Sequence, residues 1–524
     1  METTIDSWWA LFLIAAKCGA SSPLNLLHSL SLLLLLLCLP TLLLHWAHPG
    51  GPAWGKRTHC SPPIPGPRGL PLIGSMGLMV GLAHRKLAHA ANTLRTRRLM
   101  AFSLGDTRVI VTSHPDVARE VLNRSAFADR PIKETAYGLM FHRAIGFAPS
   151  GAYWRTLRSI AATHLFSPRQ ISGSEAWRLE IAADMVTALG RGGFRVREVL
   201  KRASLNNIMG SVFGKKYELF AEDKEAREVQ GLVEEGYELL GKLNWSDHLP
   251  FLAGLDLQGI RFRCSQLVPR VNRFVNRIID EHRNRTGEKK TGDFVDVLLS
   301  LQGHDKLSDG DMVAVLWEMI FRGTDTVAVL IEWVLARIIL HPRVQMKVQA
   351  ELDLAVGRSR SVAESDVARL PYTRALIKET LRMHPPGPLL SWARLAISDT
   401  WVDGWHVPKG TTAMVNMWAI ARDPHVWVRP EEFEPERFLS EGGGDVDFSI
   451  FGSDLRLAPF GSGRRSCPGK ALAMATVGFW VATLLHEYTW RSSDEAPVDL
   501  TEVLRLSCEM ASPLTVTVCP RRGL

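Results

Sequence analysis

The stretch PFGSGRRSCPGKALA, residues 459–473, places a single cysteine between a glycine-rich loop and the start of a helix. Pro468 follows Cys467, and proline is common in the first turn of a helix. The positive end of that helix, the backbone N–H groups of the loop, and the nearby Arg464 and Arg465 all favour a thiolate. A lone cysteine in apolar surroundings is usually inert packing, but this pattern predicts a stabilised thiolate at Cys467.

Other loop chemistries do not fit this stretch. It begins like a dinucleotide-binding GxGxxG at Gly461 and Gly463, but the third glycine position is Ser466, and no Walker A motif is present. The seven cysteines are widely spaced and form no CxxC pair. Zinc and iron–sulfur frameworks and a disulfide scaffold are therefore unsupported, and a reducing compartment fits best.

Length and composition describe a large domain with a basic surface. The chain has 524 residues, 46% of them hydrophobic, and a formal net charge of +8. That suits one large catalytic domain or two to three average ones. The basic surface is either solvated or attracted to anionic membrane lipid or an acidic protein partner. Lys and Arg form no long run, so the sequence predicts no nucleic-acid partner.

The N-terminal region predicts a membrane anchor. Residues 24–44 contain no Asp, Glu, Lys or Arg, and about 20 apolar residues span a bilayer as a helix. A cleaved signal peptide is the alternative, but the run is long and no A-x-A-like site follows. An earlier apolar patch, residues 8–16, is too short to span alone and either lies at the interface or extends the anchor.

Charge around the apolar run predicts its orientation. Lys56, Arg57 and Arg68 follow the run, whereas Lys17 is the basic side chain before it. The positive-inside rule then places the main body in the cytosol. A proline-rich stretch at 62–74 favours extended polyproline geometry and a semi-rigid spacer. We therefore expect three parts: an anchor over 1–46, a hinge over 47–75 and a globular domain over 76–524.

The globular part is expected to be mainly α with small β-sheets, an α+β fold. Helical periodicity dominates residues 76–524. The expected short strands are 99–104, 108–112, 401–402 and 413–415. Two glycine-containing stretches are expected to be surface loops, 282–292 and 442–444.

One expected helix has an unusual centre. It covers residues 311–340, begins after a capping-box-like pair of Ser308 and Asp311, and would be roughly 45 Å long at about 1.5 Å per residue. Its centre holds Gly323, and glycine costs about 1 kcal/mol in a helix interior. The centre is either a tolerated kink or a groove that admits a small ligand against Gly323. In the second case Thr326 and Asp325 would supply groups for proton delivery.

The cysteine loop resembles a known family. Its pattern is Phe460-x-x-Gly463-x-Arg465-x-Cys467-x-Gly469. At every defining position this matches the haem-binding signature of the cytochromes P450, the haem-thiolate monooxygenases. The fold implied is the cytochrome P450 fold, with haem buried between a long central helix and the helix of the cysteine loop.

Further matches stand in the family's order along the whole chain. Glu379 and Arg382 resemble its Glu-x-x-Arg pair, and Arg437 lies in a segment that resembles its PERF segment. The stretch 323–326 resembles its oxygen-binding groove, and the anchor and hinge resemble its microsomal members. More narrowly, FRGTDTVA and YWRTLRSI look like a plant subfamily associated with organ growth and fatty-acid hydroxylation.

The resemblance implies roles for individual residues. Cys467 would be the axial thiolate ligand of haem b, favouring O–O cleavage. Phe460 would pack beside the sulfur and haem, and Gly463 and Gly469 would also be cofactor-binding residues. The expected partners of the haem propionates are Trp154, Arg158, Arg394 and Arg465, because a guanidinium can grip a carboxylate with two bonds. Thr326 and Asp325 would deliver protons to dioxygen. The expected structural residues are Glu379, Arg382 and Arg437.

Two departures from the family fall on the central helix. Arg322 stands where the family usually has Ala or Gly, and Val327 where it often has Thr or Ser. We expect Arg322 to reach outward to solvent; contact with an anionic group, such as a substrate carboxylate, is the alternative. The expected walls of the substrate pocket are Met319, Phe321, Arg322, Leu389, Leu390, Trp392 and Leu514.

The implied function is a monooxygenase in the endoplasmic reticulum membrane. Electrons would come from an NADPH–cytochrome P450 reductase, because the chain shows no flavin or nicotinamide motif. The substrates would be O2 and a small apolar molecule, with fatty-acid hydroxylation in plant growth as the leading hypothesis. The alternatives are a reductase-independent isomerase or dehydratase and a non-catalytic haem sensor, and Thr326 and Asp325 weigh against both.

Overall fold

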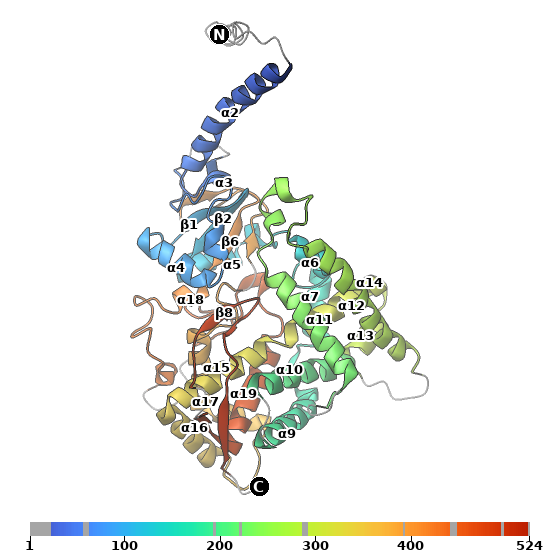
Figure 1. Cartoon of the computed structure of the whole chain (residues 1–524). Coiled ribbons are helices and arrows are strands. Elements are labelled where there is room, and N and C mark those ends of the chain that lie inside the picture. The colour runs from blue at the N-terminus through green and yellow to red at the C-terminus, as the bar shows by residue number, and fades with distance from the viewer. Residues whose placement is uncertain are drawn as a thin grey trace.

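The computed structural model describes residues 23–55, 62–191, 195–218, 223–285, 292–390, 393–440, 448–493 and 497–521. Helix α2 (Pro23–Ala47) projects from the body of the molecule (Figure 1). Among these residues, its segment Leu30–Ala47 is the one stretch long and apolar enough to cross a membrane. The apolar patch at 8–16 lies outside the described residues.

The expected hinge is packed against the body. In helix α3 (Pro52–Gly55), the indole N–H of Trp54 donates to the carbonyl of Phe102 at 3.0 Å. The proline-rich stretch then runs beside strand β1 (Met100–Leu104), where the Ala101 N–H donates to the carbonyl of Pro65 at 2.9 Å. A Cβ on Gly66 would lie 1.7 Å from the Ala101 carbonyl oxygen. The stretch is therefore fixed to the edge of the sheet as well as spacing the anchor.

The sheets are small, as expected. The largest has the order β1-β2-β6-β3, with an antiparallel β1–β2 pair and a parallel β2–β6 pair. The predicted strands are confirmed as β1, β2 (Thr107–Thr112), β4 (Thr400–Val402) and β6 (Thr412–Val415). The strands not predicted are β3 (Arg394–Leu395), β5 (Trp405–Val407), β7 (Tyr488–Ser492), β8 (Glu502–Leu504), β9 (Cys508–Met510) and β10 (Val516–Pro520).

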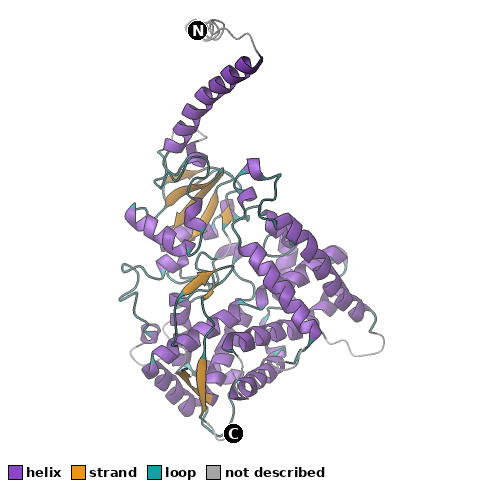
Figure 2. Ribbon diagram, viewed as in Figure 1, coloured by secondary structure: helices purple, strands orange, loops and turns teal. Residues whose placement is uncertain are grey.

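Helices make up most of the molecule (Figure 2). The remaining α-helices are α4 (Ala83–Thr93), α5 (Pro115–Asn123), α6 (Glu134–Gly138), α7 (Ala152–His164), α8 (Pro168–Gly173), α9 (Glu175–Arg191), α10 (Val196–Phe213), α11 (Lys224–Gly241), α12 (Ile260–Arg283), α13 (Phe294–Ser300), α14 (Asp309–Gly323), α15 (Thr326–Leu340), α16 (Pro342–Ala355), α17 (Pro371–Met383), α18 (Met417–Ile420) and α19 (Lys470–Glu487). Short 3-10 turns lie at η1 (Met76–Met79), η2 (Ser125–Phe127), η3 (Phe141–Arg143), η4 (Trp245–Asp247), η5 (Pro250–Leu252), η6 (Gly303–Asp305), η7 (Glu364–Arg369), η8 (Pro435–Phe438) and η9 (Gly463–Arg465). Of the expected loops, 282–292 begins inside the last turn of α12, and its residues 286–291 lie outside the described part, as does 442–444.

The expectation of one continuous helix over 311–340 is wrong. The chain forms two helices, α14 and α15, separated by Thr324 and Asp325. The hydroxyl of Thr324 donates to the carbonyl of Ile320 at 2.7 Å, a bond that competes with the helix ladder. A Cβ on Gly323 would lie 2.2 Å from a side-chain carbon of Ile208 on α10. Glycine therefore allows α10 to pack closely at the break.

Candidate active site

The cysteine loop and the central helices face one cavity, here called the cysteine cavity. Thr326 and Arg322 line it from the central helices, and Phe460 and Cys467 line it from the loop before α19. These residues are more than a hundred positions apart in the sequence. The fold thus brings together the two motifs that the sequence analysis singled out independently.

Backbone geometry explains the glycines of the loop. The Cys467 N–H donates to the carbonyl of Phe460 at 2.9 Å, which closes the loop tightly. Gly463 has φ +68°, and a Cβ there would lie 2.3 Å from the carbonyl oxygen of Leu122. Gly469 caps α19, and its N–H bonds to the sulfur of Cys467. The loop is therefore shaped to present one sulfur atom to the cavity.

Two cysteines near the core have opposite surroundings. Burial raises the pKa of the Cys467 thiol, but the Gly469 N–H and the charges of Arg322, Arg158 and Lys470 all oppose that rise. Burial and the negative charge of Glu502 raise the pKa of the Cys508 thiol. Cys508 also lies in a buried group with His84 and Glu502 and does not line the cysteine cavity. Cys467 is thus the better placed of the two to hold a metal as a thiolate. Of the adjacent arginines, Arg464 is exposed and Arg465 is buried.

Besides Arg322, four arginines line the same cavity: Arg130, Arg158, Arg394 and Arg465. They bond mainly to backbone carbonyls. Arg158 donates to Ser466 at 2.9 Å, Arg394 to Ser462 at 3.1 Å, and Arg465 to Ala148 at 2.7 Å. Arg130 donates to the carbonyls of Gly146 and Ala393. Arg465 also reaches the carboxylate of Asp129 at 3.4 Å and stacks over Trp154, 4.1 Å from the ring centre.

The charges of these arginines are poorly compensated. Burial and then the charges of Arg465 and Arg158 lower the pKa of Arg394 to about 9. Burial and the charges of Arg394, Arg465 and Arg322 hold the pKa of Arg130 well below its ordinary value. The Nε of Arg394 is buried without a hydrogen-bond partner in the described part of the chain. A cofactor with carboxylates for the arginines and a metal for Cys467 fits this donor set.

Arg130 was not predicted as a site residue. It directly precedes Pro131, in a segment without a recognised motif. Its position in the cavity depends on contacts with the loop at Gly146 and with Ala393, far along the chain.

The two residues expected to deliver protons face different cavities. Thr326 lines the cysteine cavity, whereas Asp325 lines a neighbouring side cavity bounded by α10, α11 and the β8–β9 turn. The ammonium of Lys201 lies 3.1 Å from Asp325 and 3.9 Å from Glu509 in that side cavity. The helix break therefore places two adjacent residues on different cavities: Thr326 on the cysteine cavity and Asp325 on the side cavity.

The expectation that Arg322 points outward is wrong. Arg322 lines the cysteine cavity, and its Nε donates to the carboxylate of Glu318 at 2.8 Å, one turn earlier on α14. Glu318 is buried, and it also accepts from the N–H of Gly146. The ion pair and the loop at Gly146 hold the arginine inside.

The expected pocket walls are only partly in this cavity. Met319, Phe321 and Leu390 line it. Leu389 instead lines an outer cavity between η1 and η4, and Leu514 is packed in the core, where its N–H donates to Glu332. Trp392 lies outside the described residues. Additional apolar lining comes from Val327, Leu330, Tyr237 and Leu506.

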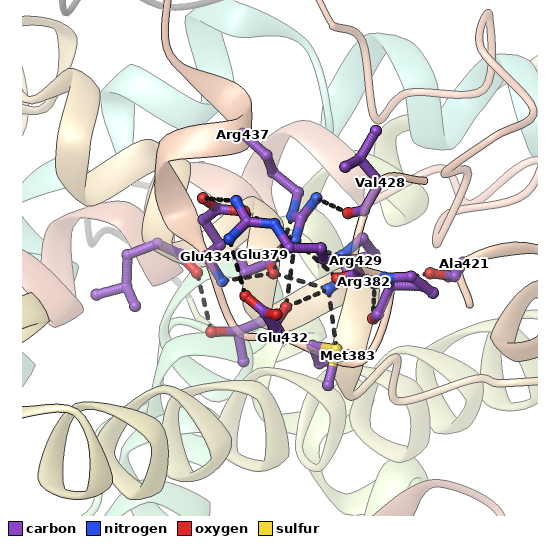
Figure 3. A network of polar contacts seen from close by, with 12 residues as sticks. Glu379, Arg382, Met383, Ala421, Val428, Arg429, Glu432, Glu434 and Arg437 are labelled. Atoms are coloured by element: carbon purple, nitrogen blue, oxygen red, sulfur yellow. Dashed lines mark hydrogen bonds and ion pairs between the residues drawn. The ribbon is translucent and has the colours of Figure 1, made fainter. Parts of the chain in front are cut away.

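Glu379, Arg382 and Arg437 form a compact network of polar contacts (Figure 3), and none of the three lines the cysteine cavity. Arg382 donates to both carboxylate oxygens of Glu379 at 2.7 Å, and Arg437 donates to Glu379 at 3.1 Å. Arg382 also donates to the carbonyls of Ala421 and Pro430. The network ties α17 to the segment around η8.

Comparisons with known proteins agree with this geometry. The family model described as Cytochrome P450 matches residues 64–510. Cytochrome P450 78A3 of Glycine max is 67% identical over 485 residues, covering 91% of this chain and 92% of that protein. Cytochrome P450 78A9 of Arabidopsis thaliana is 62% identical over 534 residues, covering 100% and 99%.

More distant relatives match over nearly the same length. Flavonoid 3'-monooxygenase of Arabidopsis thaliana is 35% identical, covering 89% of this chain and 93% of that protein. A solved zebra fish cytochrome P450 with progesterone has a TM-score of 0.71 and 27% identity, covering 84% of this chain and 99% of that chain. The chain therefore belongs to the cytochrome P450 family of haem-thiolate monooxygenases.

Proposed function

We propose that this protein is a membrane-anchored hydroxylase of medium-chain fatty acids or a related apolar signal precursor. The observation that carries the proposal is the cysteine cavity itself, where Cys467, a ring of arginines, Thr326 and an apolar wall meet. Haem b held there would supply the binding and reductive activation of O2. Cys467 would bind its iron as a thiolate, and four arginines of the lining would bind its propionates: Arg130, Arg158, Arg394 and Arg465.

The surroundings of Cys467 support its role. The Gly469 N–H bonds to the sulfur, and Arg158 lies close enough to favour the thiolate. A hydrogen bond to a thiolate also tunes the electron density that it gives to a metal. Phe460, whose carbonyl accepts from the Cys467 N–H, also lines the cysteine cavity.

Proton delivery is assigned to Thr326 and Asp325 in series. The hydroxyl of Thr326 faces the cysteine cavity and donates the proton there. Asp325 faces the side cavity, where Lys201 and Glu509 lie beside it. Its carboxylate would take a proton from solvent in the side cavity and pass it through water to Thr326, which it would reprotonate. The helix break keeps the two groups adjacent while the acid stays outside the apolar cavity.

The substrate is argued from the lining and from the relatives. Met319, Phe321, Leu330 and Leu390 offer apolar surface, as expected for a site that admits an apolar molecule. The resemblance to the plant organ-growth subfamily favours a fatty acid. A flavonoid or a steroid, as in the names of two of the relatives above, is the competing substrate class.

The partner and location follow the same reasoning. Helix α2 would anchor the chain in the endoplasmic reticulum membrane with the body in the cytosol. Electrons would come from an NADPH–cytochrome P450 reductase in that membrane. The basic net charge suits an acidic partner.

The test is a titration of the haem-loaded protein with saturated fatty acids of graded length. A saturable change of haem spin state that peaks at one chain length supports the proposal. No change with any acid, from protein with an intact thiolate-haem spectrum, overturns the fatty-acid assignment and moves the search to flavonoids and steroids.

A second readout separates the chemical classes. With reductase present, substrate-dependent NADPH consumption and a hydroxylated product are expected. Turnover without NADPH would identify an isomerase or dehydratase, and the absence of any turnover a sensor. Thr326→Ala is expected to keep NADPH consumption while product falls and peroxide rises.

A further inference from the structure

Arg322 places a positive charge on the wall of the cysteine cavity formed by α14. Its side chain is 33% exposed and lines the cavity, whereas its partner Glu318 is only 1% exposed. The cation rather than the acid is therefore the accessible member of the pair. Thr326 lines the same cavity from the start of α15, so a hydroxyl and a guanidinium share this wall.

The guanidinium is held in place from two segments of the chain. Arg322 Nε donates to Glu318 Oε1 at 2.8 Å, and the Gly146 N–H donates to both oxygens of Glu318 at 2.9 and 3.1 Å. A Cβ on Gly146 would lie 2.2 Å from Arg322 Nη2 and 2.3 Å from Glu318 Oε1. The absence of a side chain at Gly146 is therefore what lets the loop close on the ion pair.

Counting charges shows a surplus in this cavity. Its lining contains five arginines, Arg322 with the four named above, and Glu318 is the acid among the described lining residues. Asp129 compensates one more charge through Arg465. The cations in the described lining therefore outnumber its one acid, and Arg322 is the arginine on the wall that carries Thr326.

We propose that Arg322 is a cationic residue that stabilises negative charge on an anionic ligand of the haem iron in the cysteine cavity. This inference rests on the proposed haem site. A fixed cation in a low-dielectric cavity stabilises developing negative charge more strongly than water does. The family usually has Ala or Gly at this position, so the charge is not general to the family.

Cyanide and imidazole separate the effect of the Arg322 charge from the effect of the room it occupies, because cyanide binds ferric haem as an anion and imidazole as a neutral molecule. Both are titrated spectroscopically into the full-length, haem-loaded ferric protein; hydrogen cyanide releases its proton to the buffer on binding. Arg322→Gln is expected to weaken cyanide binding about tenfold, the loss of one charged hydrogen bond. Imidazole binding should stay within about twofold.

Matched variants test whether cyanide affinity follows the sign of the charge that is removed. Glu318→Gln removes the compensating acid and is expected to tighten cyanide binding, whereas Arg322→Lys should retain part of the wild-type affinity. Arg343→Gln removes an exposed arginine at the start of α16 and should change nothing. The midpoint potential of the haem should fall in Arg322→Gln and rise in Glu318→Gln.

Gly146→Ala keeps every charge but displaces the ion pair, so it carries the test if Arg322→Gln fails to bind haem. The cyanide affinity of Gly146→Ala should lie between those of the wild type and Arg322→Gln. If Arg322→Gln does not fold, the affinity of Gly146→Ala should still lie below that of the wild type. Equal cyanide affinity in wild type and variants with intact thiolate-haem spectra overturns the inference and leaves the proposed function standing. Equal weakening of cyanide and imidazole also overturns it. A wild-type protein without a thiolate-haem spectrum would instead refute the proposed haem site.

Discussion

Two groups of buried arginines in this molecule have opposite electrostatic surroundings. Arg382 and Arg437 share the carboxylate of Glu379, which is completely buried with Arg382. Arg130 and Arg394 bond to backbone carbonyls, and their pKa values are lowered by burial and by neighbouring arginines. Charges compensated within the chain stabilise the fold, whereas a surplus of one sign in a cavity indicates a site for something of the opposite sign.

Two cysteines also differ in the charges that surround them. Cys467 faces the cavity with surplus positive charge, and Cys508 lies beside Glu502. A metal-binding thiolate is favoured in the first environment and opposed in the second. The predictions below test this contrast, beginning with the largest expected effect.

The thiolate-haem spectrum should be lost when Cys467 is replaced and kept when Cys508 is replaced. Cys467→Ser is expected to abolish the thiolate-haem spectrum of the reduced carbon monoxide complex, because serine supplies no thiolate ligand. Cys508→Ser should keep that spectrum. The measurement is a reduced carbon monoxide difference spectrum on equal amounts of folded protein. The reverse pattern would assign the axial ligand to Cys508.

Removing the shared acid should destabilise the compensated network strongly. Glu379→Gln leaves Arg382 and Arg437 buried without a counter-charge, a change that typically costs about 3–5 kcal/mol. The urea midpoint of unfolding measures it, and very low soluble yield is the extreme form of the same result. Glu432→Gln is the control: this carboxylate is 59% exposed and pairs with Arg429 at the surface, so about 0.5 kcal/mol or less is expected. Equal stability of Glu379→Gln and wild type would contradict the structural role.

Removing a cavity arginine should separate stability from cofactor binding. Arg394→Gln or Arg130→Gln relieves repulsion among buried cations, so haem-free protein should be as stable as wild type or more stable. Haem should leave about tenfold faster, since a propionate loses a charged partner. Thermal unfolding and haem transfer to haem-free myoglobin measure the two effects. Lower stability with unchanged haem release would show that these arginines serve the fold.

Local chemistry was predictable from sequence, and geometry between distant segments was not. The spacing around Cys467 and the pair of Glu379 and Arg382 are encoded within a few residues, so their motifs were readable. Glu318 joins Arg322 to Gly146 only because the fold packs the loop before α7 against α14. The inward direction of Arg322 therefore could not be read from its own helix.

Two further differences have the same origin. The break between α14 and α15 depends on the approach of Ile208 to Gly323, although the poor helix formers at 323–325 marked its position. The wall residues inferred by resemblance, Leu389 and Leu514, lie in short segments whose placement is set by contacts with distant elements.

The smallest expected effect extends the comparison to a neutral side chain. His384 follows α17, the helix that carries Glu379, and its ring stacks on Trp333 with centroids 3.9 Å apart. Its Nε2 accepts from Arg337 Nε at 2.9 Å, and its Nδ1 lies 3.3 Å from Glu502. Burial lowers the pKa of His384 from 6.5 to about 4. The compensated region therefore keeps this imidazole uncharged.

The pH dependence of stability follows from that shift. Between pH 6.5 and about 4 the unfolded chain binds a proton at His384 that the folded chain does not, so the free energy of unfolding falls as pH falls through this window. Within this window one group changes the free energy of unfolding by at most about 1.4 kcal/mol per pH unit. Urea unfolding at a series of pH values should show a shallower slope for His384→Gln than for wild type, whereas His89→Gln, on the exposed face of α4, should keep the wild-type slope. An unchanged slope in His384→Gln would mean that this imidazole is charged in the folded protein, and the compensated region would then contain a cation that Glu502 must neutralise.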